Sequence, residues 1–162
     1  MTLLDLRAPI IAGRSAAGFR LGMSARELDS LLDGAVRSRD LPVPINAQLA
    51  TGRTFVVTSE MNKIRTIFFG EDVRLSFNEQ EELYCIGLAG RYQGLYLTRF
   101  GIGTLVKDLD GVQPLEFDDS DEMNYPKGQL ASGVSFGGAC SPLEVDPNQR
   151  ISYVTVHNWS RK

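Results

Sequence analysis

The sequence predicts an α+β fold of two tandem halves, each a helix followed by an antiparallel β-meander, packed as one pseudo-twofold unit. Three observations lead to this prediction. The phrase RLGMSARELDSLLDG at 20–34 returns in shorter form as GIGTLVKDLDG at 101–111. Similar lead-ins, AGRSAAGF and AGRYQGLY, precede the two copies. Short runs rich in β-branched and aromatic residues follow each copy, as expected of strands.

Chain length sets how the halves must combine. A chain of 162 residues has the usual size of one domain, and its 43% hydrophobic and 23% charged residues are typical of globular proteins. We therefore expect a single domain over 1–162, with halves at about 10–90 and about 91–162. Each half alone would bury too little apolar surface, so the two should share a core.

The first half begins with a strong helix signal. Ser24 and Glu27 have the spacing of a capping box, in which each side chain accepts a backbone N–H of the new helix. Ala25, Leu28 and Leu32 recur at helical spacing, and the Asp-Gly pair at 33–34 is a stop signal. Strands are then expected at 53–59, 63–70, 73–77 and 82–90.

The second half aligns when Gly103 is laid on Gly22 and Ile151 on Leu83. Thr104 is the expected helix cap, and the Asp-Gly pair at 110–111 is the expected end. Strands are expected at 134–138 and 150–158, with a turn at 146–149.

Composition excludes several classes of function. Seventeen basic against twenty acidic residues give a net charge of −3, which argues against nucleic acid as a partner. No apolar run approaches the roughly 20 residues of a membrane helix, and Asp5 and Pro9 make the first residues a poor signal peptide. With only Cys85 and Cys140, we expect a cytoplasmic protein without disulfides. No phosphate-binding glycine motif and no zinc-ligand spacing occurs, so neither cofactor nor metal is expected.

One catalytic motif needs weighing. GVSFG at 133–137 fits a nucleophile elbow with Ser135 as nucleophile, and Asp146 and His157 follow in hydrolase order. An elbow needs a helix directly after its serine, but Gly138 and Pro142 disfavour one. We therefore expect no catalytic residues and no enzyme, and keep a small serine hydrolase as the alternative.

The segment from Asp108 to Glu122 departs most from average composition. It holds seven acidic residues and no basic one, so the rest of the chain carries a net +4. It could bind calcium, although the D-x-D-x-D-G loop is missing; it could be a solvated loop; or it could recognise a basic partner. On the last interpretation, the interface residues are the acids and the interleaved apolar anchors Phe117 and Tyr125, namely Glu116, Phe117, Asp118, Asp119, Asp121, Glu122 and Tyr125.

GRSAAGFRLGMSARELDSLL, a meander and then GRYQG…GIGTLVKDL together resemble small bacterial immunity proteins encoded beside secreted polymorphic toxins, including those of type VI secretion and Rhs systems. This resemblance implies a cytoplasmic protein that binds and neutralises a cognate toxin, by occluding its active site or its access to target, and that has no catalytic residues. The start LGMSxxEL is also similar to the repeat unit of BamE-type lipoproteins, which implies an envelope scaffold as a further alternative. In contrast to that family, we expect neither a signal peptide nor a lipid-acceptor cysteine here. The toxin's identity, direct or allosteric inhibition, and the oligomeric state stay open.

Overall fold

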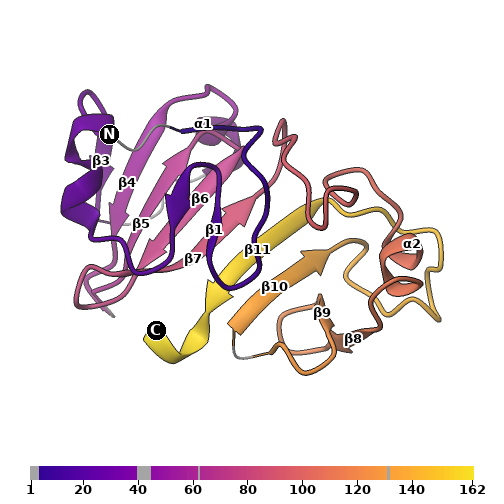
Figure 1. The fold of residues 1–162 in the computed structure, drawn as a ribbon. Coiled ribbons are helices and arrows are strands. Elements are labelled where there is room, and N and C mark those ends of the chain that lie inside the picture. Colours follow the sequence, from indigo (N-terminus) through magenta and orange to yellow (C-terminus); the bar gives the residue numbers. More distant parts are fainter. Residues whose placement is uncertain (1–3, 40–44, 62, 131) are drawn as a thin grey trace.

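The computed structural model describes residues 4–39, 45–61, 63–130 and 132–162. Its main element is one nine-stranded sheet in the order β3-β4-β5-β6-β7-β11-β10-β9-β8 (Figure 1). All neighbours are antiparallel except β3 and β4, and a separate two-stranded sheet joins β1 to β2. The strands are β1 (Ser15–Ala16), β2 (Phe19–Arg20), β3 (Val36–Ser38), β4 (Thr54–Thr58), β5 (Arg65–Phe69), β6 (Val73–Phe77), β7 (Leu83–Leu88), β8 (Leu115–Asp118), β9 (Met123–Pro126), β10 (Ser132–Gly137) and β11 (Tyr153–Asn158).

The helices in the described residues are short. They are the 3-10 helix η1 (Ala25–Leu31), α1 (Ile45–Leu49), α2 (Val106–Asp110) and the 3-10 helix η2 (Trp159–Arg161). Isolated helices of this length are unstable in water, so each depends on the sheet and loops it packs against.

The predicted fold class is wrong. The chain is mostly β and does not form two helix-plus-meander halves packed as one pseudo-twofold unit. The physical reason is that β11 pairs with β7, with Val156 opposite Ile86 and Val154 opposite Leu88. Backbone hydrogen bonds therefore run through one continuous sheet, and the short helices form no layer of their own.

Several predictions of individual helices and strands agree with the structure, although the fold class does not. The capping box of Ser24 and Glu27 is confirmed, but it opens a 3-10 helix that ends at Leu31. Thr104 does not cap α2; its hydroxyl accepts the N–H of Gly101 at 3.1 Å, and Leu105 occupies the cap position without a side-chain bond. The predicted strands correspond to β4, β5, β6, β7, β10 and β11.

The repeated glycine turns make matching hydrogen bonds. The N–H of Gly22 donates to the carbonyl of Leu83 at 2.8 Å, and the N–H of Gly103 donates to that of Ile151 at 2.7 Å. Both glycines have a positive φ, +85° and +89°, which side chains disfavour. The turn at Gly22 is therefore bonded to the first residue of β7, and the turn at Gly103 is bonded to the chain just before β11.

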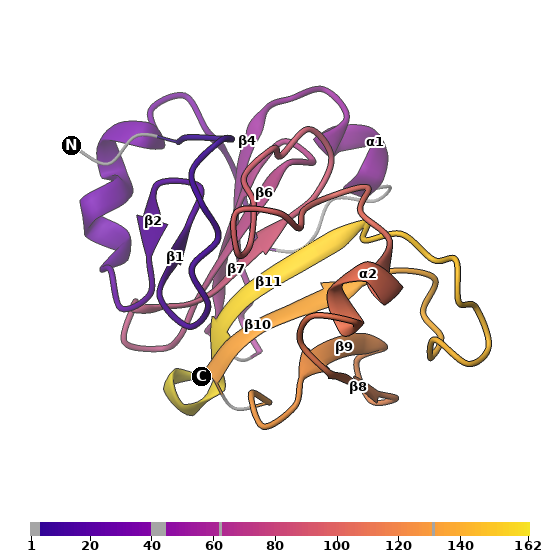
Figure 2. The same cartoon turned by 45° about the vertical axis from the view of Figure 1, so that its right-hand side comes forward.

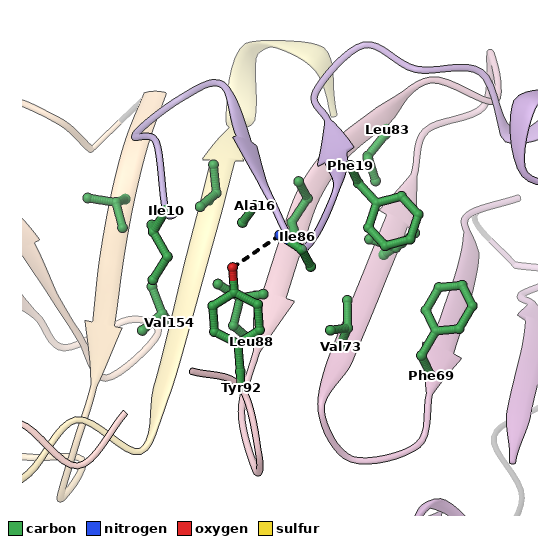
Figure 3. Packing of buried hydrophobic residues seen from close by; sticks show 14 of the residues in the cluster. Ile10, Ala16, Phe19, Phe69, Val73, Leu83, Ile86, Leu88, Tyr92 and Val154 are labelled. Atoms are coloured by element: carbon green, nitrogen blue, oxygen red, sulfur yellow. Dashed lines mark hydrogen bonds between the residues drawn. The ribbon is translucent and has the colours of Figure 1, made fainter. Parts of the chain in front are cut away.

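The core lies on one face of the sheet, where the N-terminal segment packs (Figures 1 and 2). Figure 3 shows Ile10, Ala16 and Phe19 over side chains of the sheet such as Ile86 and Val154. Phe19 stacks on Phe69 with ring centroids 5.6 Å apart. Burying one large apolar side chain contributes about 1.5–3 kcal/mol, so this cover is a main source of stability.

Candidate functional site

The acidic segment forms a β-hairpin at one edge of the sheet. β8 pairs only with β9, and a turn at 119–122 joins the two strands. Glu116 lies opposite Tyr125 and Asp118 opposite Met123, while Phe117 shares the other face with Asn124. The hairpin was missed as secondary structure, although the alternation in Leu115–Asp118 is a strand signal.

Two carboxylates hold the turn of this hairpin. Asp118 Oδ1 accepts the N–H of Ser120 at 2.8 Å and its hydroxyl at 2.6 Å, and these bonds lower the pKa of Asp118. Asp121 Oδ1 accepts the N–H of Met123 at 3.1 Å, and its Oδ2 accepts the hydroxyl of Tyr125. The turn is therefore fixed by its own acids.

Asp119 and Glu122 hold their charge differently. Both are exposed, and among the described residues the Asp119 carboxylate accepts no hydrogen bond. Glu122 has a φ of +60° and lies beside the thiol of Cys140, whose pKa rises through a hydrogen bond to that carboxylate. These two acids present the charge of the hairpin to solvent without serving the turn.

Tyr125 occupies a different place from the predicted one. Its side chain is 2% exposed, so it does not lie on the surface as an anchor. Its ring meets the edge of His157 at 5.5 Å between centroids, and burial followed by the bond to Asp121 raises its pKa above the ordinary value of 10.0. Tyr125 therefore fixes Asp121 from beneath the surface.

A shallow depression of about 440 Å³ runs along β8. Glu116, Phe117, Asp118 and Asp119 line it, together with Ser120 and Leu130. The side chain of Leu130 is 45% exposed, and sequence reasoning missed it because a lone leucine after a turn carries no distinguishing pattern. The site thus combines negative charge with two apolar side chains, Phe117 and Leu130, which is chemistry for binding.

One further acid of the segment, Asp110, supports the hairpin. Asp110, the last residue of α2, accepts the N–H of Leu115 through Oδ1 at 2.8 Å. This bond joins the helix end to the first residue of β8. The N–H of Lys127 donates to the carbonyl of Pro114 at 3.0 Å and closes the open end of the hairpin.

The residues of the alternative hydrolase lie apart. Ser135 and His157 are both fully buried, and Thr155 lies between them. The Thr155 hydroxyl bonds to that of Ser135 and is 3.4 Å from His157 Nδ1. Asp146 instead accepts the N–H of Asn148 at 3.1 Å in the loop before β11. The three side chains are not brought together, and neither Ser135 nor His157 faces an open cleft.

His157 has unusual surroundings for a buried histidine. Its ring stacks on Trp159 with centroids 4.6 Å apart, and its Nε2 has no hydrogen-bond partner in the described structure. Burial lowers its pKa below 6.5, against the opposing effects of the backbone at Gln129 and Leu130. A neutral imidazole therefore packs here as an aromatic ring.

The described residues offer neither a metal cluster nor a membrane-spanning helix. Within the described ranges, no three His, Cys, Asp or Glu side chains gather closely enough to hold a metal ion. None of the helices described is long and apolar enough to span a bilayer. No protein-family model, no curated protein and no solved structure matches this chain.

Proposed function

We propose that this protein is a cytoplasmic immunity protein that neutralises a secreted bacterial toxin by binding it through the β8–β9 hairpin. The observation that carries the proposal is the exposed acidic turn at the sheet edge, in a segment with seven acids and no base. The toxin would contribute a basic surface, such as the groove of an enzyme that acts on an anionic substrate. Binding there would occlude the active site or its access to target.

The electrostatics favour a fast and specific encounter with such a partner. Clustered charge of one sign steers a complementary surface into place and raises the association rate. Asp118 and Asp121 are already fixed by the turn, so ordering them on binding costs little conformational entropy. Preorganised charge is what an inhibitor needs in order to compete with substrate.

The apolar side chains supply what charge alone lacks. Affinity in protein interfaces concentrates in a few buried apolar or aromatic residues surrounded by polar ones. Phe117 is half-buried and Leu130 is 45% exposed, and both line the depression beside Asp119. We expect these two side chains to be covered in the complex and the acids to form its rim.

The test pairs this protein with the toxin encoded by the neighbouring gene. Growth protection on co-expression and the association rate of the purified proteins are measured for wild type and for Asp119→Lys/Glu122→Lys. We expect this double variant to lose protection and to associate at least tenfold more slowly at low salt, because two steering charges are reversed. Asp119 and Glu122 are chosen because they make no bond within the turn.

The matched control is Asp29→Lys/Asp33→Lys, which reverses two exposed acids in and just after η1, at the opposite end of the sheet (Figures 1 and 2). Its total charge change is the same, so it tests whether position matters. The assignment of the hairpin as the toxin-binding site would be rejected if Asp119→Lys/Glu122→Lys protected cells and bound the toxin as fast as wild type. Its urea midpoint should be unchanged, which shows that the variant is folded. An equal loss in both variants would also reject the assignment, because net charge alone would then explain the effect.

A further inference from the structure

A second concave site lies on the sheet face opposite the core. Strand register places Phe68, Arg74, Gly87 and Thr155 on one face, because they are paired in series across β5, β6, β7 and β11. Their neighbours Ile67, Leu75 and Ile86 point to the core on the other side. Between the first face and α1 is a pocket of about 300 Å³, lined by Ile45, Leu49, Phe68, Arg74, Tyr153 and other residues.

Gly87 explains why the pocket has a polar wall. A Cβ on Gly87 would collide with the hydroxyl and ring of Tyr153, so only glycine lets this tyrosine lie across β7. The ring then comes under the guanidinium of Arg74, with 5.5 Å between Cζ and the ring centroid. Arg74 and Tyr153 therefore contact each other on this wall of the pocket because Gly87 has no side chain.

Both residues keep an unused hydrogen-bond donor there. Arg74 Nε and the Tyr153 hydroxyl are buried and have no hydrogen-bond partner in the structure as described. Leaving such a group unsatisfied costs about 1–3 kcal/mol, more where it is charged. Burial raises the pKa of Tyr153 to about 12, so its hydroxyl keeps its proton at neutral pH.

Two neighbouring arginines pair with carboxylates, whereas Arg74 does not. Arg91 binds Asp72 at 2.7 Å and Arg65 binds Glu81 at 2.6 Å, whereas no carboxylate of a described residue lies within 4.0 Å of the Arg74 guanidinium. Glu71 also lines the pocket, but its charge acts on Arg91, whose pKa Asp72 raises first and Glu71 raises further. The neighbour that Arg74 does contact is the buried Cys85 thiol, whose pKa burial raises to about 11 and Arg74 lowers, so this partner carries no compensating charge at neutral pH. Among the described residues that line the pocket, Arg74 is thus the one cation, and no carboxylate pairs with it.

We propose that this pocket binds a small organic monocarboxylate with an apolar body. The donor atoms of Arg74 and Tyr153 are buried in the wall of the empty pocket, so both side chains shift toward the carboxylate as it accepts from them, and the body lies against Ile45, Leu49 and Phe68. A planar carboxylate matches the fork of a guanidinium, which can donate two parallel N–H bonds to it. The volume is at the lower end for ligand pockets, about 300–1,000 Å³, which suits one aromatic ring or a short branched chain.

The first experiment uses the wild-type protein alone. Phenylacetate, 3-phenylpropionate and 4-methylpentanoate are titrated up to millimolar concentration by calorimetry and by ligand-observed NMR. We expect saturable binding of at least one acid, and at least tenfold weaker binding of the corresponding amide. The amide has the same shape but lacks the charge that Arg74 would recognise. No saturable binding of any acid, or equal binding of acid and amide, would overturn the proposal.

Variants then locate the site. Arg74→Gln should weaken binding of the acid at least tenfold, and Tyr153→Phe should weaken it severalfold by removing only the hydroxyl. The matched control is Arg26→Gln, an exposed arginine of η1, which should leave binding unchanged. Unchanged binding by folded Arg74→Gln would overturn the proposal. Should Arg74→Gln fail to fold by circular dichroism, Tyr153→Phe with unchanged binding would overturn it equally. None of these tests depends on the toxin, so their failure leaves the proposed function standing.

Discussion

Replacing Gly103 with alanine isolates the energetic cost of one backbone conformation. Gly103 has a φ of +89°, and a Cβ built on it would meet nothing within 4 Å. The substitution keeps the N–H that donates to Ile151, so strain is the only new contribution in the folded state. An L-residue in this region costs about 1–2 kcal/mol. With a urea m-value of about 2 kcal/mol/M, the unfolding midpoint should fall by roughly 0.5–1 M.

Gly111 supplies the matched control eight residues away. Its φ is −65°, in the right-handed helical region at the end of α2, and an added Cβ would lie an ordinary 3.5 Å from the carbonyl of Lys107. Gly111→Ala should therefore raise stability by about 0.4–1 kcal/mol, through the unfolded chain. Urea unfolding of both variants, followed by circular dichroism, checks the difference. A Gly103→Ala midpoint equal to or above that of Gly111→Ala would refute the reasoning.

Three further predictions concern buried groups. Burial lowers the pKa of His157 below 6.5, so the unfolded chain takes up that proton first. Stability should be complete above about pH 6.5 and fall below it, and urea titrations should show a smaller fall in His157→Phe. Burial raises the pKa of Cys85 to about 11, so Ellman's reagent should modify only Cys140 in the folded protein, and faster in Glu122→Gln. Phe136→Ala, which empties a fully buried position, should cost about 3–5 kcal/mol by urea unfolding.

The strands that could be predicted are those whose side chains are nearly all apolar or β-branched. β7 is buried at every position, and β4 and β6 at most of theirs, so composition alone identifies them. β8 and β9 were missed because the acids and the asparagine that alternate with their apolar residues make the segment resemble a charged loop. The order of strands was beyond reach, since the pairing of Val156 with Ile86 joins segments that no local pattern connects.

The candidate site, too, could be predicted only in part. Charge segregation located Asp119 and Glu122 as exposed acids, because it is a property of composition. The burial of Tyr125 could not be predicted from the sequence, because it depends on His157, which packs against its ring from another strand. The unpaired hydrogen-bond donors of Arg74 and Tyr153 could not be predicted either. They meet only through the geometry of Gly87, which in the sequence is one glycine among sixteen.

The central place of β11 has a consequence for how the protein is made. β7 ends at Leu88, yet its second neighbour in the sheet begins only at Tyr153. A growing chain therefore carries an open, apolar strand edge, of the kind that invites aggregation, throughout the synthesis of everything between. The hairpin of β8 and β9 joins the sheet through β10, which itself waits for β11. On the ribosome, the acidic turn takes its place at the edge of the sheet only after Asn158 has emerged.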